Sequence, residues 1–225
     1  MNGVDADALA RAIEVLAADE PVSSLVLGSD HRPFCSGWDL RDLAQLAGAD
    51  ADRLEEFFRA GRGLLRALES FPGPVLGVVN GAALGFGLSL LAQCDVVLSA
   101  EGAVFGLPEI RRGFAPATVL PELYGVMDGR ELRAWALTGD MVPATRALAS
   151  GLVHEVVAVD DLSIRVAELV DGWGQASTAV QETKRLLGSF EGTTRPDRRG
   201  AGIAAASEYF TNNGGAALSL QTKDG

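Results

Sequence analysis

The stretch Asn80-Gly81-Ala82-Ala83-Leu84-Gly85-Phe86-Gly87 joins a predicted strand to a predicted helix near the middle of the chain. The strand is the short apolar run 75–79, and the Asn-Gly pair after it is typical of a turn. The helix is expected to open at residues 84–87 and to continue to about Gln93. Glycines let a backbone approach a ligand closely, and free N–H groups at a helix start favour an oxyanion. The stretch therefore predicts a strand-helix unit with a candidate site at its junction.

The same alternation of strand and helix extends on both sides of this stretch. Apolar residues at helical spacing predict helices over residues 6–18, capped by Asp5 or Asp7, and over 52–70. Residues 24–27 and 95–99 are predicted as strands. Strands that alternate with helices favour an α/β fold in which helices cover both faces of the sheet.

After Gly113 the pattern becomes mainly helical, with a break near Asp160. The break predicts a core over residues 1–159 and a helical part over 160–225. Expected helices cover residues 118–124, 129–138, 144–150, 161–171, 177–187 and 201–210. Apolar stripes in the second part would stay exposed on a monomer, so we expect an oligomer. The stripes are Leu162, Val166, Leu169 and Val170, and Leu186 and Leu187.

Composition and charge exclude several classes of function. The chain has 225 residues, of which 48% are hydrophobic, and one well-formed core is expected. Its 30 acidic and 19 basic residues give a net charge of -11. Because no run of basic residues is interleaved with aromatics, nucleic acid is not an expected partner, and a phosphate-bearing ligand needs a local basic patch.

Targeting and metal signals are also missing from the sequence. No apolar run approaches the roughly 18 residues of a membrane span, and no secretory signal opens the chain, so we expect a cytoplasmic protein that binds no membrane. The two cysteines, Cys35 and Cys94, are too few for a disulfide framework or a four-cysteine metal site. We therefore predict no metal site and small, buried cysteines.

Two further segments carry candidate site residues. Phe34-Cys35-Ser36-Gly37-Trp38-Asp39-Leu40 is a loop rich in turn formers, and Phe105-Gly106-Leu107-Pro108-Glu109-Ile110 contains a carboxylate. Together with the central stretch, they resemble the enoyl-CoA hydratase/isomerase (crotonase) superfamily from about Val4 to Lys184. Each motif is common by itself, but their order and spacing together are specific to this family. The other motifs are Cys94-Asp95, Leu137-Thr138-Gly139-Asp140, Gly151-Leu152-Val153 and Thr183-Lys184-Arg185.

The resemblance implies a fold and a reaction class. The fold is a crotonase-type spiral of ββα units with a helical C-terminal trimerisation region, and the assembly is a homotrimer or a dimer of trimers. The substrate is an acyl-CoA or related thioester, and no cofactor is implied beyond the coenzyme A of the substrate. Family members begin with about two strands and a loop before the first helix, which this sequence lacks.

The resemblance also implies roles for single residues. The backbone N–H groups of Trp38 and Phe86 are expected to converge on the thioester oxygen, and Glu109 is the expected acid/base. The residues expected to line the substrate pocket are Ser36, Trp38, Asp39, Leu40, Arg41, Phe86 and Ser89. Glu109 is expected on a loop, with a pKa raised by an apolar surrounding of Phe86, Phe105, Leu107 and Phe114.

One departure from the family decides between reactions. Hydratases of the family carry a second glutamate where this chain has Ser89. Adding water across a double bond requires two groups, which orient and deprotonate the water and deliver a proton. Moving a double bond needs one base, so Δ3,Δ2-enoyl-CoA isomerisation is favoured. The dienoyl isomerases of the family are excluded, because their additional aspartate would fall at position 117, where this chain has Ala117. The alternatives are a hydratase of weak or altered activity, with Ser89 holding water, and a non-catalytic subunit that keeps the fold.

Other readings of the same residues are less favoured. The glycine spacing after residue 84 is not that of a dinucleotide fingerprint. Ser89 lacks a nucleophile elbow, and the candidate bases of a serine hydrolase are His31 and His154. His154 is expected to make a local hydrogen bond, Asp39 and Asp95 to satisfy loop and helix ends, and Trp38 to form a pocket wall.

Overall fold

The computed structural model describes residues 1–18, 22–30, 33–46, 48–190, 197–198, 200–206 and 208. It forms two compact units, Met1–Ser177 and Thr178–Gly225. The unit boundary lies C-terminal to the break expected near Asp160. His31 lies outside the described residues. Of the helix expected over 201–210, residues 201–206 and 208 are described and helical.

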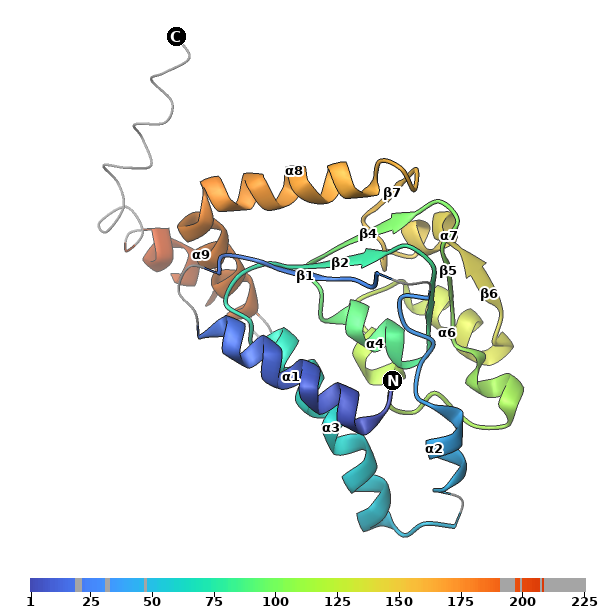
Figure 1. Ribbon diagram of the computed structural model, residues 1–225. Coiled ribbons are helices and arrows are strands. Elements are labelled where there is room, and N and C mark those ends of the chain that lie inside the picture. The colour runs from blue at the N-terminus through green and yellow to red at the C-terminus, as the bar shows by residue number, and fades with distance from the viewer. Residues whose placement is uncertain are drawn as a thin grey trace. The chain divides into compact units, whose positions relative to one another are not determined.

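Two small sheets organise the first unit (Figure 1). The larger sheet has four parallel strands in the order β1-β2-β4-β7, and the smaller has the order β3-β5-β6 with β6 antiparallel. The strands are β1 (Leu25–Leu27), β2 (Val75–Val79), β3 (Ala82–Leu84), β4 (Val96–Ala100), β5 (Val104–Gly106), β6 (Met141–Pro143) and β7 (Glu155–Val157).

Helices fill most of the connections between strands. The helices are α1 (Gly3–Ala17), α2 (Leu40–Ala44), α3 (Ala51–Glu69), α4 (Phe86–Ala92), the 3₁₀ helix η1 (Pro108–Arg112), α5 (Leu120–Leu123), α6 (Gly129–Thr138), α7 (Ala144–Ala149), α8 (Leu162–Gln175) and α9 (Ser177–Gly188). Within the described residues, none of them is long and apolar enough to cross a membrane.

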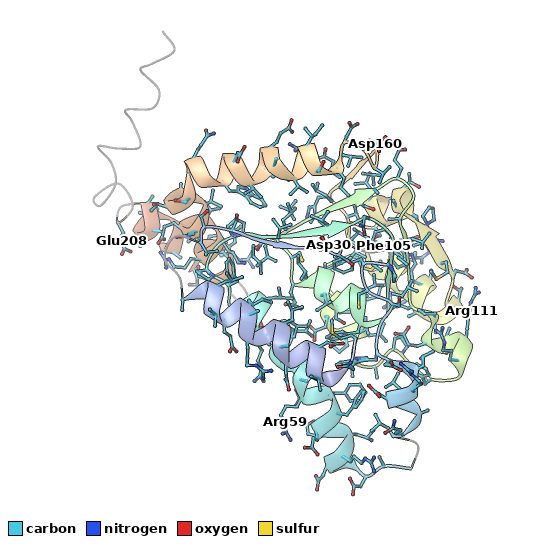
Figure 2. All side chains as sticks on the ribbon, viewed as in Figure 1. Asp30, Arg59, Phe105, Arg111, Asp160 and Glu208 are labelled. Carbon is cyan, nitrogen blue, oxygen red and sulfur yellow. The ribbon has the colours of Figure 1, made fainter. Side chains whose placement is uncertain are left out.

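Both faces of the larger sheet are covered, as its alternating side chains require. Val75 packs in a cluster with α1 and α3, and Val97 packs in a cluster with α4. Leu76 and Leu98 point the other way and pack against α8, which lies along that face in Figure 1. Phe105 of β5 is fully buried in the interior (Figure 2). The expected α/β architecture is confirmed.

Several elements differ from those expected. The first helix is capped by Asn2, whose side chain accepts a hydrogen bond from the Asp5 N–H, and not by Asp5 or Asp7. Glu109 lies on the 3₁₀ helix η1 and not on a loop, because Pro108 suits the first turn of a helix. Strands β3, β5, β6 and β7 each have three residues, too short for a clear period in the sequence.

The apolar stripe on α8 packs within the first unit. Leu162 is buried in a cluster with Leu76 and Leu98, and Val166 and Leu169 pack against the same cluster. These side chains therefore do not need a second copy of the chain to cover them. The exposed apolar side chains expected on α8 are therefore no argument for an oligomer. That the chain forms an oligomer stays a prediction.

Candidate active site

Strand β3 holds the first site loop beside the central stretch. The Cys35 N–H donates to the Ala82 carbonyl at 3.1 Å, and the Leu84 N–H donates to the Cys35 carbonyl at 2.8 Å. Gly87 permits this approach, since a Cβ there would lie 2.7 Å from the Cys35 oxygen. The loop 34–40 and the start of α4, about 50 residues apart in the sequence, are thus fixed side by side.

Two glycines with positive φ meet where these segments touch. Gly37 has φ +87° and Gly85 has φ +52°. A Cβ on Gly37 would lie 3.7 Å from the Phe86 nitrogen and 3.8 Å from the Gly85 Cα. A positive φ is unfavourable for residues with a side chain, so both positions suit glycine.

The N–H groups of Trp38 and Phe86 stand beside this glycine pair. Phe86 is the first residue of α4, where an N–H has no partner inside the helix. Within the described part of the chain, neither N–H makes a hydrogen bond. Their neighbours are held firmly, because the Gly85 N–H donates to the Gly106 carbonyl at 3.0 Å and the Asp39 N–H to the Met1 carbonyl at 2.8 Å. Two free donors are therefore carried on anchored peptides.

Glu109 faces the same glycine pair from the third segment. It is only 9% exposed, and a Cβ on Gly85 would lie 2.5 Å from its Oε1. Its Oε2 is buried and has no hydrogen-bond partner among the residues that the structure describes. Burial raises the pKa of the Glu109 carboxyl, and a backbone hydrogen bond and the charge of Arg112 oppose this rise. The predicted direction of the pKa shift is confirmed, and its first cause is desolvation.

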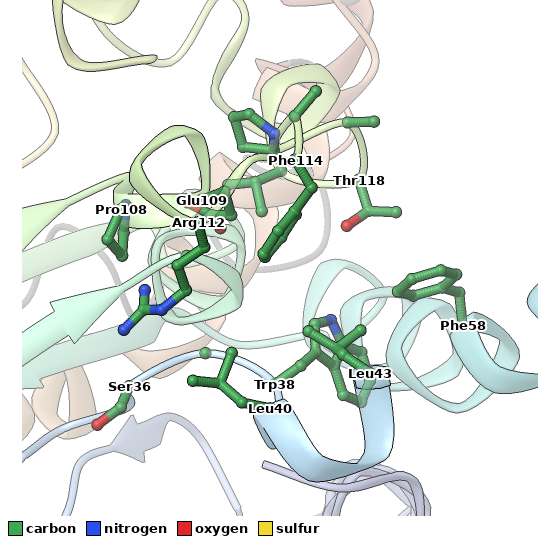
Figure 3. Close-up of a pocket in the computed structure, with 16 residues that line it drawn as sticks. Ser36, Trp38, Leu40, Leu43, Phe58, Pro108, Glu109, Arg112, Phe114 and Thr118 are labelled. Carbon is green, nitrogen blue, oxygen red and sulfur yellow. The ribbon is translucent and has the colours of Figure 1, made fainter. Parts of the chain in front are cut away.

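A cavity of about 170 Å³ opens in front of these groups (Figure 3). Its walls are mainly apolar and include the side chains of Trp38, Leu43, Phe58 and Phe114. Among the described residues that line it, Glu109 is the only acid. A lone carboxylate in an apolar cavity can exchange a proton with a bound molecule at a pH closer to neutral than an ordinary carboxyl can.

The indole of Trp38 forms one wall of this cavity, as expected. Its ring centroid lies 4.5 Å from that of Phe86 and 5.2 Å from that of Phe57. A Cβ on Gly61 would lie 2.5 Å from the indole ring. Gly61, which weakens the helical pattern of α3 in the sequence, therefore makes room for the Trp38 ring.

The structure brings together some of the predicted site residues and separates others. Ser36, Trp38, Leu40 and Glu109 line the cavity. The Phe86 side chain is buried in the cluster of α1 and α3, but its N–H lies beside Gly37. Sequence reasoning missed the lining residues Leu43, Phe58, Arg112 and Thr118, whereas Phe114 had been expected as a neighbour of Glu109.

Asp39, Arg41 and Ser89 are not among the residues that line the cavity. Asp39 caps α2 through the Arg41 N–H at 2.8 Å and forms an ion pair with the Arg41 side chain at 2.9 Å. The Arg41 partner lowers the pKa of Asp39 to about 2. Both residues line a separate hollow beside α1 and α3. Ser89 is fully buried in α4, and its Oγ has no partner.

Other residues play the supporting roles that were expected. His154 accepts a hydrogen bond from the Val97 N–H at Nδ1, 2.9 Å away, and so fastens the chain beside β4. Asp95 accepts one from the Val75 N–H at 2.7 Å. Cys35 is buried and free, and burial raises the pKa of its thiol.

The raised pKa of Glu109 predicts a pH-dependent cost in stability. The unfolded chain releases this proton at the ordinary carboxyl pKa, whereas the folded protein keeps it to a higher pH. Over that window the folded state holds more protons, so stability falls as the pH rises through it. We expect Glu109→Gln to raise the free energy of unfolding at neutral pH. Urea unfolding over a pH series tests this, and a gain that persists below the ordinary carboxyl pKa would contradict it.

Comparison with known proteins gives consistent matches. A profile described as enoyl-CoA hydratase/isomerase matches residues 4–215. The chain is 31% identical over 208 residues to a 2,3-dehydroadipyl-CoA hydratase of Escherichia coli, which covers 90% of this chain and 77% of that protein. It is 32% identical over 177 residues to a crotonyl-CoA hydratase of Syntrophomonas wolfei, which covers 75% of this chain and 66% of the relative, just under two thirds.

The structural comparison agrees with the sequence comparison. An enoyl-CoA hydratase of Mycobacterium smegmatis superposes with a TM-score of 0.87 at 26% identity, covering 96% of this chain and 85% of that one. The similarity therefore extends over the site segments and the sheets that position them.

Proposed function

Because this chain belongs to the enoyl-CoA hydratase/isomerase family, we propose that it forms the enolate of an acyl thioester and moves a double bond from C3 to C2. The observation that carries the proposal is the buried Glu109 carboxylate, with one unpaired oxygen, in an apolar cavity. A single carboxylate suffices to take a proton from one carbon and return it to another.

In the proposed mechanism, the thioester oxygen lies between the N–H groups of Trp38 and Phe86. Glu109 takes a proton from C2, and the electron pair left behind spreads over the double bond and the carbonyl, so that negative charge develops on the oxygen. The two N–H groups stabilise this charge, each by about 3–4 kcal/mol when well placed. Protonated Glu109 then delivers the proton to C4, which leaves the double bond at C2.

The proposed reaction uses no separate cofactor, since coenzyme A enters as part of the substrate. Apolar walls exclude water, which protects the enolate and strengthens the two hydrogen bonds to its oxygen. We also propose that the protein works as a homotrimer or a dimer of trimers, as the family resemblance implies.

Hydration of a 2-enoyl-CoA is the second candidate, favoured by the hydratase names of the relatives. In that reaction Glu109 works on the attacking water. Ser89 was expected to hold this water in place of a second carboxylate, but it is buried in α4 and does not line the cavity. The non-catalytic subunit is the third candidate. It rests on the same replacement at Ser89.

The wild-type protein separates these candidates when it is given 3-enoyl-CoA and 2-enoyl-CoA of short and long chains. Isomerisation of the 3-enoyl substrates supports the proposal. Hydration of the 2-enoyl substrates without isomerisation supports the second candidate. A protein that binds the thioesters and converts neither, or binds none, supports the third.

Ser89→Ala tests whether a residue other than the base takes part in isomerisation. The Ser89 hydroxyl is buried without a partner, so its removal should leave the free energy of unfolding unchanged or raise it by about 1 kcal/mol. Because Ser89 does not line the cavity, we expect isomerisation to be retained. Urea unfolding and steady-state kinetics measure both effects, and a large loss of isomerisation in a folded variant would show that the hydroxyl acts in the reaction.

A further inference from the structure

Arg112 brings a positive charge to the edge of the cavity. It is the last residue of η1, and Gly113 follows in the left-handed conformation with φ +83° and ends that helix. Among the described residues that line the cavity, Arg112 is the only basic one. In Figure 3 its side chain passes beside Glu109, and the guanidinium points to the side where Ser36 and Pro108 lie, away from Phe58.

The guanidinium of Arg112 forms no ion pair within the described part of the chain, although its charge acts on Glu109. Its neighbour Arg111 forms an ion pair with Asp140 and also donates to the Thr138 carbonyl at 3.4 Å. Arg41, which lines the separate hollow beside α1 and α3, is paired with Asp39. Arg112 makes neither a hydrogen bond nor an ion pair among the described residues, so all of its N–H donors remain available to a bound molecule.

The surroundings of Arg112 favour an anionic group on the bound molecule. The protein carries a net charge of -11, which repels anions at long range. A planar guanidinium that donates hydrogen bonds to both oxygens of a carboxylate is a strong local exception. Arg112 itself is exposed, so solvent moderates this attraction, and the contact depends on the geometry of the two hydrogen bonds.

We propose that Arg112 binds a carboxylate carried by the acyl group itself, so that the preferred substrate is the thioester of an unsaturated dicarboxylic acid. This inference rests on the proposed thioester function. The position of Arg112 favours an acyl carboxylate over a coenzyme A phosphate, since Arg112 and Glu109 line the same cavity and belong to the same short helix η1. Glu109 in turn lies against Gly85, where the reacting carbons are expected, whereas the phosphates are separated from the thioester by the long pantetheine arm.

Binding of saturated thioesters tests this inference without any reaction. Glutaryl-CoA and pentanoyl-CoA have acyl chains of equal length and differ in the terminal carboxylate. We expect the wild type to prefer glutaryl-CoA. Arg112→Gln should weaken glutaryl-CoA binding by about 10- to 100-fold, the effect of losing a charge-assisted hydrogen bond, and should leave pentanoyl-CoA binding nearly unchanged. Isothermal titration calorimetry measures both dissociation constants.

Two further variants make the test specific. Arg111→Gln is the matched control, because Arg111 is adjacent, exposed and paired with Asp140 (Figure 2); it should keep the preference for glutaryl-CoA. Arg112→Lys keeps the charge and loses the planar fork, so it should weaken glutaryl-CoA less than Arg112→Gln does. It also provides the test if Arg112→Gln does not fold.

The outcomes separate this inference from the proposed function. Equal weakening of both thioesters by Arg112→Gln would mean that Arg112 serves the coenzyme A part, and would overturn the inference. A wild type without preference for glutaryl-CoA would also overturn it. A clear preference that depends on Arg112, in a protein that isomerises nothing, would support the inference and reject the proposed reaction.

Discussion

Glu109→Gln is expected to lower the rate of 3-enoyl-CoA isomerisation by about 10²- to 10⁴-fold. The amide keeps the shape of the side chain and cannot take a proton from carbon. The carboxylate is the only acid among the described residues of the cavity, so no neighbour there can replace it. Steady-state kinetics with wild type and variant measure the loss in kcat.

Thioester binding should change little in Glu109→Gln, since the proposed contacts to the thioester oxygen come from backbone N–H groups. The control is Glu101→Gln, which alters an exposed carboxylate in the turn after β4 and should keep full activity. If Glu109→Gln isomerises at the wild-type rate, Glu109 is not the base. If the wild type converts neither 3-enoyl-CoA nor 2-enoyl-CoA, the non-catalytic subunit becomes the better account.

Gly85→Ala is expected to lower isomerisation by about 10²- to 10³-fold, the effect of losing one oxyanion donor. The new Cβ would lie 2.5 Å from the Glu109 Oε1, so the carboxylate or the peptide that carries the Phe86 N–H must move. The variant also places a side chain at φ +52°, which costs about 1–2 kcal/mol of stability. Kinetics and urea unfolding measure the two effects separately.

Gly125→Ala is the matched control for this backbone strain. Gly125 has φ +92°, and a Cβ there would meet nothing within 4 Å. It should therefore lose stability as Gly85→Ala does and keep its rate of isomerisation. A similar loss of rate in both folded variants would mean that strain, and not the geometry beside Glu109, explains the effect of Gly85→Ala.

Much of the fold could be predicted because its longer elements carry clear periods. Helix α3 was expected over 52–70 and spans Ala51–Glu69, and strand β2 was expected over 75–79 and spans Val75–Val79. The helix α2 and the strands β5 and β6 were missed. Each has three to five residues, and such elements are stabilised by tertiary contacts, which leave no local pattern.

Part of the site could be predicted because several of its residues stand in recognisable motifs. The glycines and Glu109 stand in motifs with fixed spacing, and the structure brings Gly37, Gly85 and Glu109 together. Asp39 and Arg41 lie in the same motif but satisfy each other at the start of α2. Leu43, Phe58 and Arg112 come from segments without a motif, and only the folded chain makes them neighbours of one cavity.

The sequence by itself determined the longer helices and strands and the order in which these occur, and the resemblance of its motifs to the family pointed to the glycines and to Glu109. These properties are local, because they depend on side-chain period, backbone freedom and charge at fixed spacing. The tertiary structure alone decided which side chains share the cavity, which face of α8 is covered and that Arg112 forms no ion pair with the residues described. Such facts depend on contacts between distant segments, and it is burial by those contacts that raises the pKa of Glu109 and leaves its Oε2 without a partner.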